Sequence, residues 1–115
     1  MPRFEPGDIV RVPFPYTNRD THQHRPALVV SGGELAGGML VWALMITSRE
    51  NRSWVGDVPI RSPVHSTGLM APSMVRTAKI ATIESAVAER IGRLGDGELL
   101  QVQIELAETL RLARA

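Results

Sequence analysis

The sequence predicts a β-rich fold that ends in one helix, because two kinds of hydrophobic pattern meet near Gly95. Before this residue, short apolar runs alternate with clusters of glycine, proline and polar residues, which is typical of strands and turns. After it, Leu99, Val102, Leu106 and Leu110 recur at helical spacing. This periodicity predicts an amphipathic helix that packs on the preceding sheet.

The composition is that of an ordinary globular protein, and we expect one domain over residues 1–115 without repeats or linkers. Hydrophobic residues make up 43% of the chain and charged residues 22%, so a real core can form. The net charge of +1 neither requires nor excludes nucleic acid as a partner. The chain has no cysteine, which excludes disulfides and thiolate metal sites and fits a reducing cytoplasm. No apolar run approaches the ~20 residues of a membrane helix, and the first residues predict no signal peptide.

The first half of the chain predicts three strands. Residues 8–14 alternate in polarity, and Pro13 places this strand near a sheet edge because proline donates no ladder hydrogen bond. Residues 27–31 form a short continuous apolar run, which favours a central strand. Residues 39–48 form a second, longer apolar run, and the glycine-rich residues 32–38 connect the two.

The second half is less regular. Residues 49–57 read as a polar loop with one tryptophan, and residues 58–63 as a short strand. Residues 74–83 predict one or two β-rich segments, and residues 84–97 a helical turn followed by a short strand. Asp96 is the expected N-cap of the final helix.

The two apolar runs beside the glycine-rich connection predict an antiparallel hairpin. The centre of the connection lies near Leu35 or Ala36. A turn centred on Ala36 places Arg25 opposite Thr47, and opposed residues share a face with Cβ atoms about 5 Å apart. A slip of one residue would reverse the faces. A guanidinium fork beside a hydroxyl could hold a phosphoryl oxygen on which charge grows in a transition state. The alternative is that Arg25 ends in solvent and Thr47 simply favours the strand.

Six short segments, from Gly7 to the C-terminal helix, carry a resemblance to a known family. In chain order they are GDIVRVPFPYT, RPALVVS, ITS, TGL, VRTAKIATI and IGRL. Their order and spacing resemble the MazF/PemK (Kid-like) family of type II toxins. The resemblance implies an α+β fold, an SH3-like β-barrel with a C-terminal amphipathic helix, usually as a homodimer. It also implies an endoribonuclease without metal or cofactor, which cuts single-stranded RNA at short sequences and is neutralised by a cognate antitoxin.

The resemblance assigns catalysis to Arg25, which matches the family's RP motif, and to Thr47, which matches its T[SA] motif. In metal-free RNA cleavage the ribose 2′-OH attacks the adjacent phosphorus, so the protein supplies no nucleophile. The protein must orient the phosphate, stabilise added negative charge and move two protons. Arg25 would bind the phosphate, and Thr47 would donate to a non-bridging oxygen. The need for a 2′-OH implies a preference for RNA over DNA.

The resemblance does not assign the general base to one residue. Some relatives carry a carboxylate two residues after the arginine that matches Arg76, whereas this chain has Ala78 there. His22 and His24 lie where relatives place substrate contacts, and a histidine can serve as the base. His22 is favoured, since on an ideal strand His24 would point away from Arg25. Solvated histidines are the alternative.

Further RNA contacts are expected from Arg49, Arg52 and Trp54, since basic residues with an aromatic suit backbone contact and base stacking. The alternative is a loop with its tryptophan tucked onto the barrel. Arg76 either contacts RNA or braces the sheet. The three histidines lack metal-ligand spacing, so no metal site is expected. The alternative to an enzyme is a binding protein on the same fold, either a degenerate toxin or an inhibitor of a protein such as gyrase.

Overall fold

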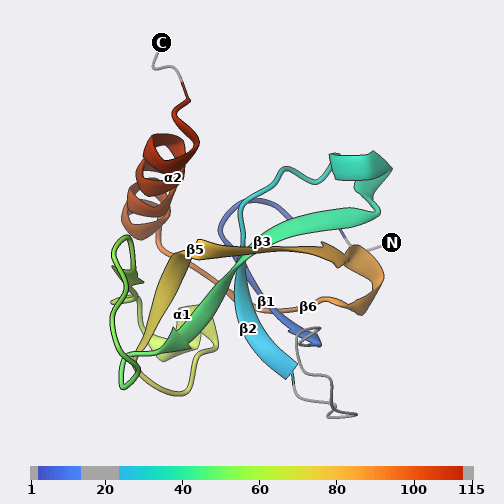
Figure 1. Cartoon of the computed structure of the whole chain (residues 1–115). Helices are drawn as coiled ribbons and strands as arrows, with labels where there is room; N and C mark the ends of the chain where they lie inside the picture. The colour runs from blue at the N-terminus through green and yellow to red at the C-terminus, as the bar shows by residue number, and fades with distance from the viewer. Residues whose placement is uncertain (1–2, 14–23, 113–115) are drawn as a thin grey trace.

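A computed structural model describes residues 3–13 and 24–112 (Figure 1). Its strands form one antiparallel sheet with the order β4-β5-β3-β2-β1-β6. The strands are β1 Asp8–Pro13, β2 His24–Val29, β3 Leu40–Ser48, β4 Val58–Pro59, β5 Ser73–Glu84 and β6 Glu89–Arg93. The helices are η1 Leu35–Gly38, α1 Val64–Thr67, η2 Ser85–Val87 and α2 Asp96–Leu110, of which η1 and η2 are 3-10 helices. None of the helices in the described part is long and apolar enough to cross a membrane.

The sheet is strongly curled (Figure 1). Each of its two faces carries a hydrophobic cluster. Alternation along each strand divides the side chains between the faces: Ala27 belongs to one cluster and Leu28 to the other. The long helix α2 covers the Leu28 side, where Val102 is fully buried and Leu99 and Leu106 pack against the same cluster. The curled six-stranded sheet and the final helix confirm the predicted α+β fold.

The strand β1 lies one place inside the sheet edge, between β2 and β6. Its pairing with β6 runs only as far as Arg11 opposite Glu89, whereas on the other side Pro13 lies opposite His24. Proline is therefore placed beyond the part of β1 that is paired on both sides, where its missing N–H costs no ladder hydrogen bond.

The hairpin of β2 and β3 has the predicted register. Ala27 lies opposite Met45 and Val29 opposite Ala43, which corresponds to a turn centred on Ala36. The turn is made by two residues in the left-handed region, Ala36 with φ 50° and Gly37 with φ 67°. This register brings the first residues of β2 beside the last residues of β3.

The predicted β-rich segment after residue 73 is one long strand, β5, interrupted by a register shift. On the facing strand Ile46 pairs with Val75, but Leu44 pairs with Ile80. Residues 76–79 therefore all lie opposite Met45. A bulge re-aims the side chains of the extra residues and bends the strand, so it can direct polar residues of β5 toward the end of the β2–β3 hairpin.

The helix α2 begins at Asp96 itself, so the prediction that Asp96 is the N-cap was wrong. The N-cap is Gly95, and its capping position carries no side-chain hydrogen bond. The first turn is instead fixed by Glu98, whose carboxylate accepts hydrogen bonds from the N–H groups of Arg61 and Ser62 and from the Ser62 hydroxyl. A longer-range contact thus replaces the local cap, and it joins α2 to the segment after β4.

Candidate functional site

Arg25 and Thr47 line one cavity of about 280 Å³, where β2 begins and β3 ends. Its other lining residues are Met45, Ile46, Arg76 and Lys79. The hairpin register supplies Arg25 and Thr47, whereas the bulge in β5 supplies Arg76 and Lys79. Every ionisable side chain that lines the cavity is cationic, and no carboxylate does so within the described ranges. Such a cavity is suited to bind an anion.

The hydroxyl of Thr47 is held by an amide from the loop that follows β3. The Asn51 Nδ2 group donates a hydrogen bond to Thr47 Oγ1 over 2.6 Å. A tight turn brings Asn51 there, because its N–H donates to the Ser48 carbonyl (3.0 Å) and the Glu50 N–H donates to Ser48 Oγ (3.2 Å). Asn51 is not among the site residues that the sequence predicts. The only signal was a short amide in a polar loop four residues after Thr47.

Arg76 is a buried brace for this same loop, and only 8% of it is exposed. Its guanidinium donates to both carboxylate oxygens of Asp57 (3.3 and 3.0 Å) and to the Arg52 carbonyl (2.7 Å). It also lies over the Trp54 ring, 3.9 Å from the centroid. These contacts give Arg76 a bracing role, and a contact between Arg76 and RNA stays a prediction. The Asp57 side chain, which the sequence does not point to, is only 4% exposed. Removal of one partner of such a buried ion pair strongly destabilises the fold, because the other charge is left buried and unpaired.

Arg52 and Trp54 do not line the Arg25–Thr47 cavity. Arg52 offers its carbonyl to Arg76, and the Trp54 ring packs against the same guanidinium while 46% of the residue stays exposed. The loop is tied down once more by the Thr77 hydroxyl, which donates to the Gly56 carbonyl (2.8 Å). The tryptophan is thus tucked onto the sheet, and an RNA contact by Arg52 or Trp54 stays a prediction.

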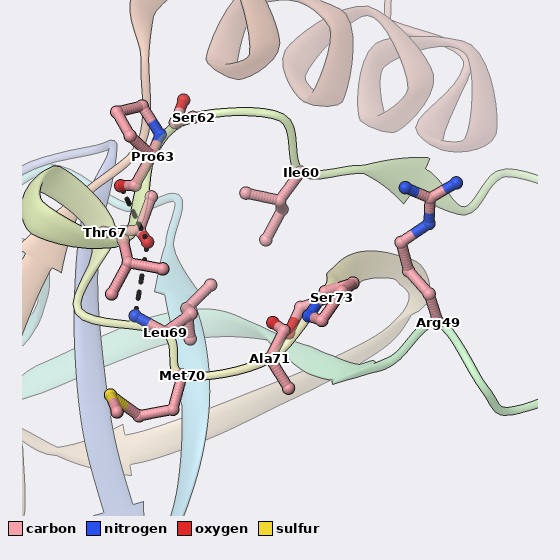
Figure 2. Close-up of a pocket in the computed structure, with 11 residues that line it drawn as sticks. Arg49, Ile60, Ser62, Pro63, Thr67, Leu69, Met70, Ala71 and Ser73 are labelled. Carbon is pink, nitrogen blue, oxygen red and sulfur yellow. Dashed lines mark hydrogen bonds between the residues drawn. The ribbon is translucent and has the colours of Figure 1, made fainter.

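Arg49 lines a different pocket, of about 320 Å³ (Figure 2). Figure 2 shows it on one side of this pocket, across from Thr67, Leu69 and Met70. The remaining wall is mostly apolar, and the Thr67 hydroxyl is engaged by the Pro63 carbonyl and the Leu69 N–H. The structure therefore does not place Arg49 in the same cavity as Arg25 and Thr47.

Of the two histidine candidates for the base, His24 lies in the described part of the chain, where it is not among the residues that line the cavity. His24 is the exposed first residue of β2, opposite Pro13, and it does not line the cavity. Strand alternation directs it to the face opposite that of Arg25. His22 lies outside the described residues. Within the described ranges no three His, Asp or Glu side chains gather in a way that could hold a metal ion.

Comparisons with solved structures show the same fold. A MazE–MazF complex from Deinococcus radiodurans matches with a TM-score of 0.74 and 22% identity over 98% of this chain and 100% of that one. An endoribonuclease in complex with its cognate antitoxin, from mycobacterial species, matches with a TM-score of 0.74 and 20% identity over 96% and 98%. The Mycobacterium tuberculosis toxin MazF-mt6 matches with a TM-score of 0.67 and 20% identity over 96% and 100%.

Sequence comparison gives a family but no individual relative. None of the curated proteins matches the chain. Residues 5–110, however, match the family described as PemK-like, MazF-like toxin of type II toxin-antitoxin system. This match covers nearly all of the sequence, including both strands that carry Arg25 and Thr47. The chain therefore belongs to the PemK-like, MazF-like family of toxins of type II toxin–antitoxin systems.

Proposed function

We propose that this protein is a sequence-specific endoribonuclease toxin that cuts single-stranded RNA without a metal ion. The observation that supports it most is the shared cavity of Arg25 and Thr47, which is lined by cationic side chains and no carboxylate in the described ranges. Membership of a toxin family, and the likeness in fold to an endoribonuclease, support the same reaction. A pure protein-binding module has no need for a guanidinium and a hydroxyl side by side.

The reaction uses the substrate's own nucleophile. The ribose 2′-oxygen attacks the adjacent phosphorus, a P–O2′ bond forms, and the P–O5′ bond breaks. The products are a 2′,3′-cyclic phosphate and a free 5′-OH. One proton leaves the 2′-OH and one joins the departing 5′-oxygen, so the protein must place an acid and a base.

The cavity accounts for the charge that grows on the phosphate. The Arg25 guanidinium offers a planar fork of donors that matches two phosphoryl oxygens, and it stays charged at every physiological pH. The Thr47 hydroxyl donates to a non-bridging oxygen of the same phosphate. Lys79, on the same cavity wall, adds positive charge. Donors fixed before the reaction stabilise the pentacovalent transition state without reorganising. His22 stays the proposed general base, with His24 as the second candidate.

The proposed partners are single-stranded RNA, a second copy of the chain and a cognate antitoxin. RNA would lie along a groove shared by two subunits, and an acidic antitoxin segment would compete with phosphate for Arg25. We expect light scattering at micromolar concentration to give the mass of a dimer. A monomer that cuts RNA at the full rate would contradict the shared groove.

Incubation of the purified protein with a long unstructured RNA in EDTA is the decisive experiment. We expect discrete fragments whose 3′ ends carry a 2′,3′-cyclic phosphate or its hydrolysis product and whose 5′ ends are free hydroxyls. Sequencing of the 5′ ends would then give the recognition sequence, and addition of the cognate antitoxin should stop cleavage. Intact RNA would contradict the proposal and leave a binding protein on the same fold.

A further inference from the structure

The hydrogen bond between Asn51 and Thr47 restricts the direction of a hydroxyl that the proposed reaction uses. A threonine hydroxyl has one hydrogen to donate and two lone pairs to accept with. Asn51 Nδ2 donates to Thr47 Oγ1 over 2.6 Å, so one lone pair is occupied by a donor. The hydroxyl hydrogen cannot point toward that N–H group. It is therefore turned to another side, where a phosphoryl oxygen in the cavity can accept it.

The position of Asn51 is secured from both ends of its loop. At the near end, the turn after β3 holds it through the Ser48 carbonyl. At the far end, the buried Arg76 guanidinium on β5 donates hydrogen bonds to the Asp57 carboxylate and to the Arg52 carbonyl. Asn51 itself is exposed, but the loop that carries it is not free to swing away.

We propose that Asn51 is a positioning residue, which makes Thr47 a hydrogen-bond donor to the scissile phosphate. This inference rests on the proposed ribonuclease function and deepens it. It assigns Asn51 a role in the chemical step rather than in binding RNA. The Arg76–Asp57 pair then supports catalysis indirectly, because it anchors the loop that presents the amide.

The test is Asn51→Asp, which keeps the shape of the side chain and replaces its N–H donors by a carboxylate acceptor. A carboxylate draws the Thr47 hydroxyl hydrogen to itself in a charge-assisted bond. The hydroxyl then no longer donates to phosphate. We expect the single-turnover rate at saturating protein to fall about as far as in Thr47→Ala, tenfold or more.

The double variant separates positioning from a structural or a simple charge effect. If Asn51 acts through Thr47, adding Asn51→Asp to Thr47→Ala should change the saturated rate less than about threefold. The new negative charge weakens RNA binding in both backgrounds, so it appears in the protein concentration needed for half-saturation and not in the comparison of saturated rates. Circular dichroism controls for folding of all three variants.

Each result has a separate meaning. No cleavage by the wild type would contradict the ribonuclease proposal itself. Cleavage by Thr47→Ala at the wild-type rate would remove the hydroxyl from the mechanism and overturn the inference with it. An impaired Thr47→Ala beside an Asn51→Asp variant at the wild-type rate would overturn the inference alone. So would a full additional loss in the double variant, because Asn51 would then act independently of Thr47.

Discussion

Arg25→Ala should lower the single-turnover rate of RNA cleavage by about 10²–10³-fold, because the transition state loses a charge-assisted donor. This loss corresponds to roughly 3–4 kcal/mol of activation free energy. Thr47→Ala should cost less, since a neutral hydroxyl forms a weaker hydrogen bond than a guanidinium. The measurement uses an RNA that carries one mapped cleavage site, with protein in excess.

The same substitution should leave the fold intact. Arg25 is an exposed residue at the start of β2, and it belongs to neither hydrophobic cluster. Its truncation opens no core cavity, so we expect the free energy of unfolding to change by about 1 kcal/mol or less.

A matched control is Arg61→Ala, which removes one exposed arginine that does not line the cavity. It tests whether the loss in Arg25→Ala merely reflects lower net charge and weaker attraction to RNA. Arg61→Ala should cut RNA at close to the wild-type rate. A folded Arg25→Ala protein that cuts within threefold of the wild type would exclude Arg25 from the mechanism.

Replacement of one ribose by 2′-deoxyribose at the cleaved linkage should abolish cutting there. The 2′-oxygen is the nucleophile in the proposed reaction. Among the described residues, the side chains that line the cavity are those of Arg25, Met45, Ile46, Thr47, Arg76 and Lys79. None of these is a serine, cysteine or carboxylate, and the proposed reaction uses Thr47 as a hydrogen-bond donor and Lys79 as a positive charge. The substituted RNA should still bind, because its phosphates are unchanged. The readout is the end-point yield of fragments at that one linkage.

The control for this experiment is a 2′-deoxy substitution several nucleotides from the cleaved linkage, which should leave the rate unchanged. Binding of both RNAs is measured separately by titration of fluorescence anisotropy. Equal cutting at a linkage with and without its 2′-OH would exclude transfer to the ribose oxygen, and a hydrolytic route with water as nucleophile would replace it.

Much of the fold followed from local patterns in the sequence. The alternation of apolar residues gave the strands, and the helical spacing after Gly95 gave α2. The hairpin register was among those predicted, because the side-chain period of two ties the register to which apolar residues face the core. One of these registers places Arg25 opposite Thr47, and both residues line one cavity in the structure. These features depend on residues close together in the chain.

The environment of that pair was decided by contacts between distant segments. Nothing in the local sequence of β5 specifies that residues 76–79 bulge opposite Met45, since this follows from how two long strands curl around one core. The bulge turns Arg76 toward Asp57 and Trp54, 19 and 22 positions earlier in the chain. The local turn after β3 brings Asn51 beside Thr47, and the long-range contacts of Arg76 hold the loop that carries it. The sequence by itself determined the strands, the final helix and the Arg25–Thr47 pair, because periodicity and turn chemistry are local. Only the tertiary structure decided which side chains surround the pair, because those contacts depend on the bulge in β5 and on the packing of distant segments.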